Sequence, residues 1–225
     1  MIEREKILGR IREALKVAAH VPGARQDAGG TSAPLSSARQ WLPKVGGSFD
    51  EQLALFQKNA LELKADFQWL GSRDELKTAL TKLRDAENWK RLATHHGELT
   101  DFICKAIDLP ICFTDKIYDV HELETCDAGI SECDALIAQT GTILVTNRSA
   151  GGRALSVLPP HHIVLARREQ LIADLPAAFE LLKQKYAANF PSMISFITGP
   201  SRTGDIERIL VLGAHGPKKL TILCF

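Results

Sequence analysis

The residues best suited to chemistry lie in residues 197–206, which read Ile-Thr-Gly-Pro-Ser-Arg-Thr-Gly-Asp-Ile. Residues 193–198 are apolar enough to predict a buried strand, and residues 206–210 predict a turn of helix. Ligands of open α/β sheets bind outside the carboxyl ends of strands, and the free N–H groups at a helix start favour an anion. Arg202 has the geometry to hold a carboxylate or phosphate with two hydrogen bonds. This loop therefore predicts an anion site, with Ser201 and Thr203 supplying hydroxyls.

A simpler interpretation of the same loop is that Ser201, Thr203 and Asp205 only cap the helix. Gly199 and Gly204 have the spacing of a P-loop, but Asp205 and Ile206 stand where that motif needs Lys and Ser or Thr. An acid there would repel the phosphates, so an ATPase of that class is excluded. The chain also lacks the G-x-G-x-x-G fingerprint of dinucleotide binding.

Two further segments are expected to join this site at a shared sheet edge. His215, followed by Gly216 and Pro217, supplies an imidazole between flexible residues, either for proton transfer or simply bonded to a backbone carbonyl. Residues 139–142 are a turn between two predicted strands. The candidate ligand-binding residues are Gln139, Thr140, Gly141, Thr142, Gly199, Pro200, Ser201, Arg202, Thr203, Asp205, His215 and Gly216.

Asp205 and His215 are also the weak candidates for catalysis, although the sequence assigns no catalytic residue. Glu132 and Asp134 are further acid/base candidates, because they would share a face if their segment is extended. The pairs His95–His96 and His161–His162 are adjacent, so on a strand their side chains face opposite sides and cannot form one metal site. The five cysteines contain no C-x-x-C pair, and we predict that this chain binds no metal or cofactor.

Composition excludes several classes of protein. The 225 residues carry 28 Lys and Arg against 27 Asp and Glu, a net charge of +1 that argues against a dedicated nucleic-acid binder. No run of apolar residues is long enough for a transmembrane helix, and the charged N-terminus does not resemble a secretion signal. Reduced cysteines and this N-terminus predict a cytoplasmic protein. Homo-oligomerisation is left open.

The elements that must position the candidate residues alternate along the chain. Helices are predicted at residues 50–63, 72–83 and 99–107, and strands at 66–70, 91–94, 111–113, 162–166 and 220–225, with a strand pair in 134–145. Asp174 and Pro176 predict the start of another helix. This alternation predicts an α/β fold with a mostly parallel sheet and helices on both faces.

The N-terminal part has a different composition. Residues 2–18 predict an amphipathic helix, and residues 21–48 are rich in Gly, Pro and Ser, which is typical of a flexible arm. We therefore expect residues 1–48 to form a helix and arm, and residues 49–225 to form the α/β domain. The helix could dock on a partner or pack on its own domain.

The motifs in the second half resemble the LUD-domain family of lactate-utilization proteins. The resemblance rests on Gln-Thr-Gly-Thr at 139–142, Gly-Arg-Ala-Leu-Ser at 152–156 with the following Leu-Pro-Pro-x-His-Ile-Val, and the segments 198–207 and 210–217. It covers residues 127–225 well and 49–127 only by pattern. The family commonly has Glu before Thr-Gly-Thr, where this chain has Gln139, so a carboxylate needed there would be missing.

The resemblance implies a fold similar to the sugar-phosphate isomerase and CoA-transferase superfamily. It also implies a role in oxidising L-lactate to pyruvate, with partner subunits that carry the iron–sulfur clusters. We therefore expect an accessory or ligand-binding subunit that holds a small anion at the loop 199–205. The alternatives are a stand-alone enzyme for a phosphorylated or CoA-linked substrate, and a regulatory protein that binds a carboxylate.

Overall fold

The computed structural model describes residues 43–115, 117–203 and 211–225. The predicted helix 2–18, most of the predicted arm, Asp205 and the predicted helical turn 206–210 lie outside the described residues. The division of the chain at residue 48 stays a prediction. Ser48 begins helix α2 (Phe49–Glu62) with a capping box, in which its side chain and that of Glu51 bond each other's backbone N–H groups.

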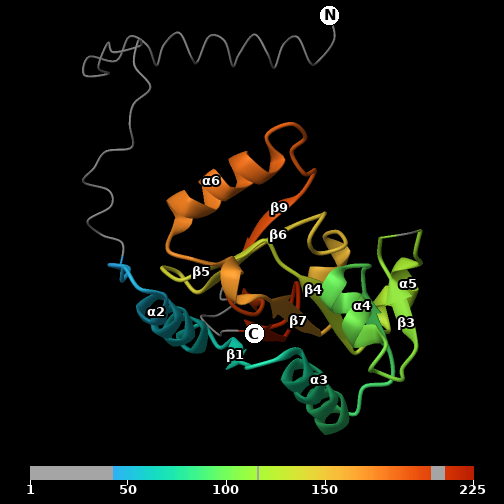
Figure 1. The fold of residues 1–225 in the computed structure, drawn as a ribbon. Coiled ribbons are helices and arrows are strands. Elements are labelled where there is room, and N and C mark those ends of the chain that lie inside the picture. The colour runs from blue at the N-terminus through green and yellow to red at the C-terminus, as the bar shows by residue number, and fades with distance from the viewer. Residues whose placement is uncertain (1–42, 116, 204–210) are drawn as a thin grey trace, which may run out of the picture. The chain divides into compact units, whose positions relative to one another are not determined.

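The main sheet has six parallel strands in the order β1-β12-β7-β4-β2-β3 (Figure 1). Their bounds are β1 Asp66–Trp69, β12 Lys219–Cys224, β7 His161–Ala166, β4 Ala128–Glu132, β2 Leu92–Thr94 and β3 Ile111–Phe113. Most of these strands match predicted ones. The last strand of the chain, β12, lies inside the sheet between β1 and β7.

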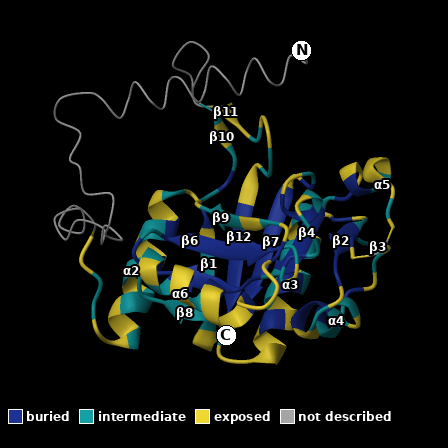
Figure 2. Cartoon of the chain, turned by 90° about the horizontal axis from the view of Figure 1, so that it is seen from above, coloured by how far each residue is buried: buried dark blue, intermediate teal, exposed yellow. Residues whose placement is uncertain are grey.

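Strand β7 shows why the sheet is buried on both faces. Its side chains alternate, so that Ile163 and Leu165 join one core cluster while Val164 and Ala166 join another. Every residue of β7 is buried, as a central parallel strand requires. Figure 2 shows the inner strands in the colour of buried residues and the exposed surfaces on the helices.

One face of the parallel sheet is covered by helices α3 (Arg73–Glu87) and α4 (Glu98–Cys104), whose apolar side chains pack on it. Helix α3 begins at Ser72, whose hydroxyl accepts a hydrogen bond from the Glu75 N–H at 3.2 Å. The short helix α5 (Val120–Glu124) covers the end of the sheet near β2 and β3.

The other face is covered by α2 and by a second, four-stranded sheet in the order β8-β5-β6-β9. Its strands are β8 Leu171–Ile172, β5 Ala135–Ile137, β6 Thr142–Thr146 and β9 Ile194–Ile197. Helix α6 (Leu175–Tyr186) lies over the outer face of this sheet (Figure 1), and it begins with Asp174 as its cap, as predicted. The α/β class and the mostly parallel main sheet are confirmed, but one face carries a sheet as well as a helix.

Two expectations near the C-terminus are wrong. The strand predicted at 193–198 is an edge strand of the second sheet, not a buried one, and Ile194 is 38% exposed. Arg202 and Thr203 do not lie in a loop before a helix, because they form strand β10 (Arg202–Thr203), which pairs antiparallel with β11 (Val211–Leu212). No helix in the described part of the chain is long and apolar enough to cross a membrane.

Candidate functional site

A polar pocket of about 210 Å³ lies where three neighbouring strands of the parallel sheet end. We call it the carboxyl-edge pocket. One side of the pocket is lined by residues directly after β2, at and just after the end of β4, and directly after β7. The second sheet and α6 form the remaining side. The lining residues are His95, His96, Gly97, Glu132, Cys133, Arg148, Ser149, Arg167, Gln170 and Lys185.

The position of this pocket follows from the order of the strands. From β2 the chain goes on to β3 on one side, whereas from β4 the next strand of the same sheet is β7 on the other side. The connections therefore diverge between β2 and β4. Such a divergence opens a crevice outside the carboxyl ends of the strands, which is where open α/β sheets bind ligands.

Glu132 ends β4 and serves mainly to hold the pocket wall together. Its Oε1 accepts hydrogen bonds from the backbone N–H of Leu99 at 2.8 Å and of Thr100 at 3.4 Å, at the start of α4. Its Oε2 lies 3.5 Å from Arg167 Nη1. With these partners the carboxylate caps a helix, so it is not a free acid or base.

Asp134 is the centre of a buried polar cluster beside the pocket. Its Oδ1 accepts hydrogen bonds from Lys185 Nζ at 2.6 Å and Tyr186 OH at 2.7 Å, and its Oδ2 accepts one from Ser149 Oγ at 2.6 Å. Asp134 and Glu132 therefore face different partners and do not form the carboxylate pair that their spacing suggested. The side chain of Asp134 is completely buried, whereas that of Lys185 is 47% exposed.

The cluster keeps Asp134 ionised. Burial by itself would raise the pKa of Asp134, but the hydrogen bonds from Lys185, Ser149 and Tyr186 outweigh it and hold the pKa below its usual range. The ammonium group of Lys185 is thereby fixed at the pocket wall. Burial raises the pKa of the neighbouring Cys133 thiol well above its usual value, so this cysteine is a neutral lining group and not a nucleophile.

Arg148 is a cation in the pocket lining whose N–H groups are not all used in hydrogen bonds. Its Nη2 donates to the backbone oxygen of Asn189 at 2.9 Å, and its guanidinium lies 5.4 Å from the ring centroid of Tyr186. Within the described residues it forms no ion pair with a carboxylate, whereas Arg167 pairs with Glu98 and Glu132. Arg148 therefore offers an anion in the pocket a positive charge that no described carboxylate neutralises.

His95 and His96 follow β2 but differ in their surroundings. His95 is buried, its Nδ1 lies 3.0 Å from the backbone oxygen of His96, and its Nε2 accepts from the Glu132 N–H at 3.2 Å. Both ring nitrogens are engaged by backbone groups, so His95 is a structural residue. His96 is exposed and bonds a carboxylate, Asp101, through Nδ1 at 3.0 Å.

Gly151 allows the pocket to close around His95. Its φ is +61°, and a Cβ at this position would lie 2.3 Å from the Cβ of His95 and 2.7 Å from Thr114 Oγ1. Its backbone oxygen accepts a hydrogen bond from Thr114 at 2.8 Å. A side chain is therefore excluded here both by backbone conformation and by space.

The predicted segment 139–142 is the tight turn between β5 and β6. Asn59 of α2 donates to the backbone oxygens of Ala138 and Gln139 at 2.9 and 3.0 Å, and Gly141 turns with φ +62°. The Gln139 amide donates to the Pro43 oxygen at 3.2 Å, while its buried Oε1 has no partner in the described part of the chain. Gln139 is thus placed to hold the segment before α2 in position.

The structure does bring the predicted segments next to one another. Thr142 Oγ1 lies 2.9 Å from Thr198 Oγ1, and the Ser201 N–H donates to the Pro217 oxygen at 2.9 Å. Gly216 approaches the Ser201 side chain, and His215 is exposed in the segment between β11 and β12. Arg202 is exposed, and its guanidinium folds back to the Thr198 oxygen at 3.4 Å. Pro200 is buried beside them.

This group lies at the other end of the parallel strands. The Lys218 N–H, just before β12, donates to the Pro160 oxygen just before β7, so residues 215–217 adjoin the amino ends of these strands. Strand β9, which leads to Arg202, belongs to the second sheet. The rule about carboxyl ends of parallel strands therefore does not support a site at residues 199–205, and the described residues there supply no helix start.

Sequence reasoning missed His96, Arg148 and Lys185. One signal was available: residues 95–97 directly follow a predicted strand, the position at which ligand-binding residues of a parallel sheet are found. For Arg148 and Lys185 there was no such signal, because the folding of α6 onto the second sheet brings them to the pocket.

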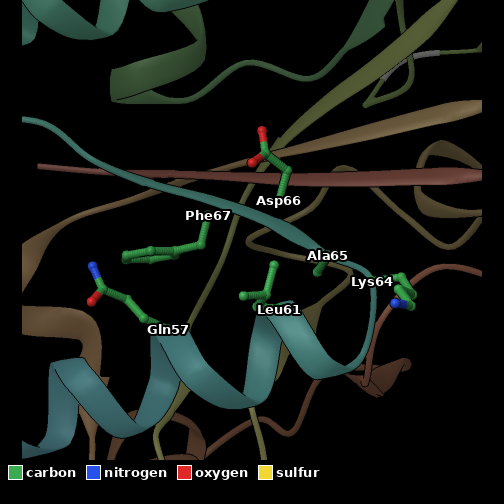
Figure 3. A pocket seen from close by; sticks show the side chains of 6 residues that line it. All are labelled: Gln57, Leu61, Lys64, Ala65, Asp66 and Phe67. Carbon is green, nitrogen blue, oxygen red and sulfur yellow. The ribbon is translucent and has the colours of Figure 1, made fainter.

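A larger groove of about 500 Å³ lies elsewhere, between the end of α2 and the start of β1. Figure 3 shows Gln57 and Leu61 rising from α2 towards the strand that carries Phe67. The groove is at the amino end of β1, and its charged groups, Lys64 and Asp66, do not face a common point. Its shape alone does not make it a site for polar ligands.

Comparison with known proteins supplies the family. The LUD domain profile matches residues 112–224, which is half of the chain. The chain belongs to the LUD domain family. The match includes Glu132, Arg148 and Lys185 of the carboxyl-edge pocket but not His96.

The relatives extend this result. The chain is 29% identical over 179 residues to lactate utilization protein C of Shouchella clausii, an alignment that covers 76% of this chain and 78% of that protein. It is 36% identical over 100 residues to lactate utilization protein C of Halalkalibacterium halodurans, covering 44% of each. A crystal structure of a DUF162 family protein from Deinococcus radiodurans matches 80% of this chain and 99% of that one, with a TM-score of 0.63 and 22% identity. This likeness supports the fold.

Proposed function

We propose that this LUD-domain protein takes part in lactate utilization as an accessory, ligand-binding component. The proposal is supported by relatives called lactate utilization protein C, one of which aligns with 76% of the chain. The electrons from lactate would then pass to partner proteins that carry iron–sulfur clusters, as the family resemblance implies. A cytoplasmic location belongs to the same proposal, and it is supported by five cysteines that all remain free thiols.

We assign the ligand to the carboxyl-edge pocket, and one observation carries this assignment. Arg148 is a cation without a carboxylate partner in the described part of the chain, and it lines a pocket at the divergence point of the parallel sheet. The pocket volume of about 210 Å³ corresponds to about seven water molecules at about 30 Å³ each. A small carboxylate such as lactate or pyruvate fits that volume.

The loop 199–205 remains the competing site for the same anion. There Arg202, Ser201 and His215 would be the ligand-binding groups. The two assignments differ in which arginine holds the carboxylate, so one pair of variants separates them.

The test is calorimetric titration of L-lactate and pyruvate into the wild-type chain, Arg148→Ala and Arg202→Ala. A hydrogen bond to a charged group contributes about 1.5–3 kcal/mol, so Arg148→Ala should weaken binding roughly ten- to a hundredfold. Arg202→Ala should leave the Kd within about twofold. The opposite pattern would move the site to the loop, and a wild-type chain that binds neither acid would refute ligand binding.

The accessory role needs a separate measurement. The isolated chain should not reduce an artificial electron acceptor with lactate, and it should be captured by the iron–sulfur partner proteins. Lactate oxidation by the chain alone would contradict this role. Turnover of a sugar phosphate or an acyl-CoA by the isolated chain would favour the stand-alone enzyme.

A further inference from the structure

His96 lines the carboxyl-edge pocket and is held in a single orientation by two contacts. Its Nδ1 lies 3.0 Å from Oδ1 of Asp101, on the first turns of α4. Its ring is stacked on Phe113 of β3, with centroids 4.3 Å apart and an angle of 9° between the planes. Rotating the ring out of its plane would lose the stacking on Phe113, and a 180° flip within that plane would lose the bond to Asp101.

These contacts also determine which ring nitrogen carries the proton. A carboxylate only accepts hydrogen bonds, so Asp101 selects the form of His96 with the proton on Nδ1. In the neutral ring, Nε2 then has a free lone pair. The described residues offer no hydrogen-bond partner to this nitrogen, whereas both nitrogens of the neighbouring His95 are occupied by backbone groups.

We infer that His96 accepts a hydrogen bond from the hydroxyl group of a bound 2-hydroxy acid, and that it thereby distinguishes this acid from the 2-oxo acid. The inference rests on the proposed function, because it places the ligand in the carboxyl-edge pocket with its carboxylate near Arg148. A 2-hydroxy acid has a proton to donate at its second carbon. A 2-oxo acid presents only an oxygen lone pair there, which repels the lone pair of Nε2.

Asp101 is a positioning residue in this arrangement. Its replacement by Asn removes this selection, because the amide can either accept from or donate to Nδ1, so that both neutral tautomers become available and one of them has a donor at Nε2. The tautomer with the proton on Nε2 would suit the keto oxygen of a 2-oxo acid. The selectivity between the two acids should therefore shift without a new contact to the carboxylate.

The experiment measures the ratio of the Kd values for pyruvate and L-lactate by calorimetry at neutral pH. One hydrogen bond contributes about 0.5–1.5 kcal/mol, so the wild-type chain should prefer lactate roughly two- to tenfold. His96→Phe keeps an aromatic ring against Phe113 and should remove this preference by weakening lactate alone. Asp101→Asn should lower it. His121→Phe, at an exposed histidine beside Glu124, is the matched control and should change nothing.

A ratio that His96→Phe leaves unchanged would overturn the inference, provided that circular dichroism shows a folded variant. An unchanged ratio in Asp101→Asn alone would remove Asp101 from its positioning role. Failure of the proposed function looks different, because Arg148→Ala would then leave the binding of both acids intact. A wild-type chain that binds neither acid would refute both proposals.

Discussion

Both ends of the parallel strands carry polar side chains, but the two ends differ in how far the hydrogen-bonding groups of these side chains are used. At the amino end, His161 Nδ1 lies 3.0 Å from Glu87 and its Nε2 lies 2.9 Å from Thr221 Oγ1. Glu87 also accepts from Trp89 at 3.2 Å and Lys219 at 2.8 Å. At the carboxyl end, Arg148 and His96 keep groups that no described residue occupies.

Because of this difference, we expect the amino end to contribute to the stability of the fold and the carboxyl end to the recognition of a ligand. A buried polar group whose partners are all inside the protein stabilises the fold and offers nothing to a ligand. A group that is held in place but has capacity left over can bind a ligand without rearrangement. Changes at the saturated amino end should therefore alter stability alone, and changes of Arg148 and His96 at the carboxyl end should alter binding.

The largest effect is expected for Asp134→Ala, because Asp134 both stabilises the fold and holds Lys185 at the pocket wall. Removing the buried carboxylate leaves the hydroxyls of Tyr186 and Ser149 with only longer contacts to Thr146, at 3.3 and 3.4 Å, and releases Lys185 from the pocket wall. We expect the free energy of unfolding to fall by about 3–5 kcal/mol and lactate binding to weaken. Urea unfolding and calorimetry measure the two effects.

The control for this prediction is Asp101→Ala, at an exposed carboxylate that pairs with His96. It should cost less than about 1 kcal/mol of stability, because exposed pairs contribute little. Equal losses of stability in Asp134→Ala and Asp101→Ala would contradict the central role of the cluster.

The contribution of Asp134 to stability should also depend on pH. Since the pKa of Asp134 is lowered in the folded chain, this contribution is present above about pH 4 and is lost as the pH falls through the folded pKa.

The second effect concerns Gly151, which lets the pocket close against His95. Alanine in this left-handed conformation costs about 1–2 kcal/mol, and the clash with His95 should add about 1–3 kcal/mol. Gly152→Ala is the matched control, because Gly152 also has a positive φ of +105° but no atom lies near its added Cβ. Thermal unfolding should rank Gly151→Ala well below Gly152→Ala. Equal stabilities would mean that the close approach to His95 is not important.

The third effect tests the saturated amino end through pH. His162 bonds Ser131 Oγ at 2.8 Å, and burial, with a smaller contribution from His161, lowers its pKa to about 3. Between about pH 6.5 and 3, His162 is protonated in the unfolded chain but neutral in the folded chain. The free energy of unfolding therefore falls by about 1.4 kcal/mol per pH unit on acidification.

His162→Gln should flatten this slope between about pH 6.5 and pH 5, a window set by the ordinary titration of histidine. Urea unfolding at several pH values measures the slope. His121→Gln, at an exposed histidine, should leave the slope as in the wild type. A slope that survives in His162→Gln would assign the pH dependence to another group.

The comparison also shows what the sequence could and could not reveal. The strand at His161–Ala166 and helices α2, α3 and α6 were predictable, because periodicity and caps are local signals. The membership of β9 in a second sheet was not predictable, since an apolar run has the same pattern in either sheet. Strand β10, Arg202–Thr203, has no apolar residue, and these polar residues equally suit a loop.

The site was harder to predict than the fold. Lys185 reaches Asp134 across 51 residues of sequence, and only the packing of α6 on the second sheet brings them together. The segments around Gly141, Ser201 and Gly216 do lie next to one another, but their role as a ligand site stays a prediction. What the sequence could not show is that they adjoin the amino ends of the parallel strands, where the rule that suggested a ligand does not apply.

The smallest effect is expected for Lys219→Ala, and this variant gives the sharpest contrast between the two ends. Lys219 is 61% exposed and bonds Glu87, which keeps His161 and Trp89 as partners after the change, so the cost should stay below about 1 kcal/mol. Lys219→Ala and Arg148→Ala each lower the net charge from +1 by one, to zero. If anions were attracted only by the overall field, both variants would weaken lactate binding alike. A specific site predicts a large loss for Arg148→Ala and an unchanged Kd for Lys219→Ala, measured at a salt concentration of about 0.1 M, where the screening length is about 10 Å.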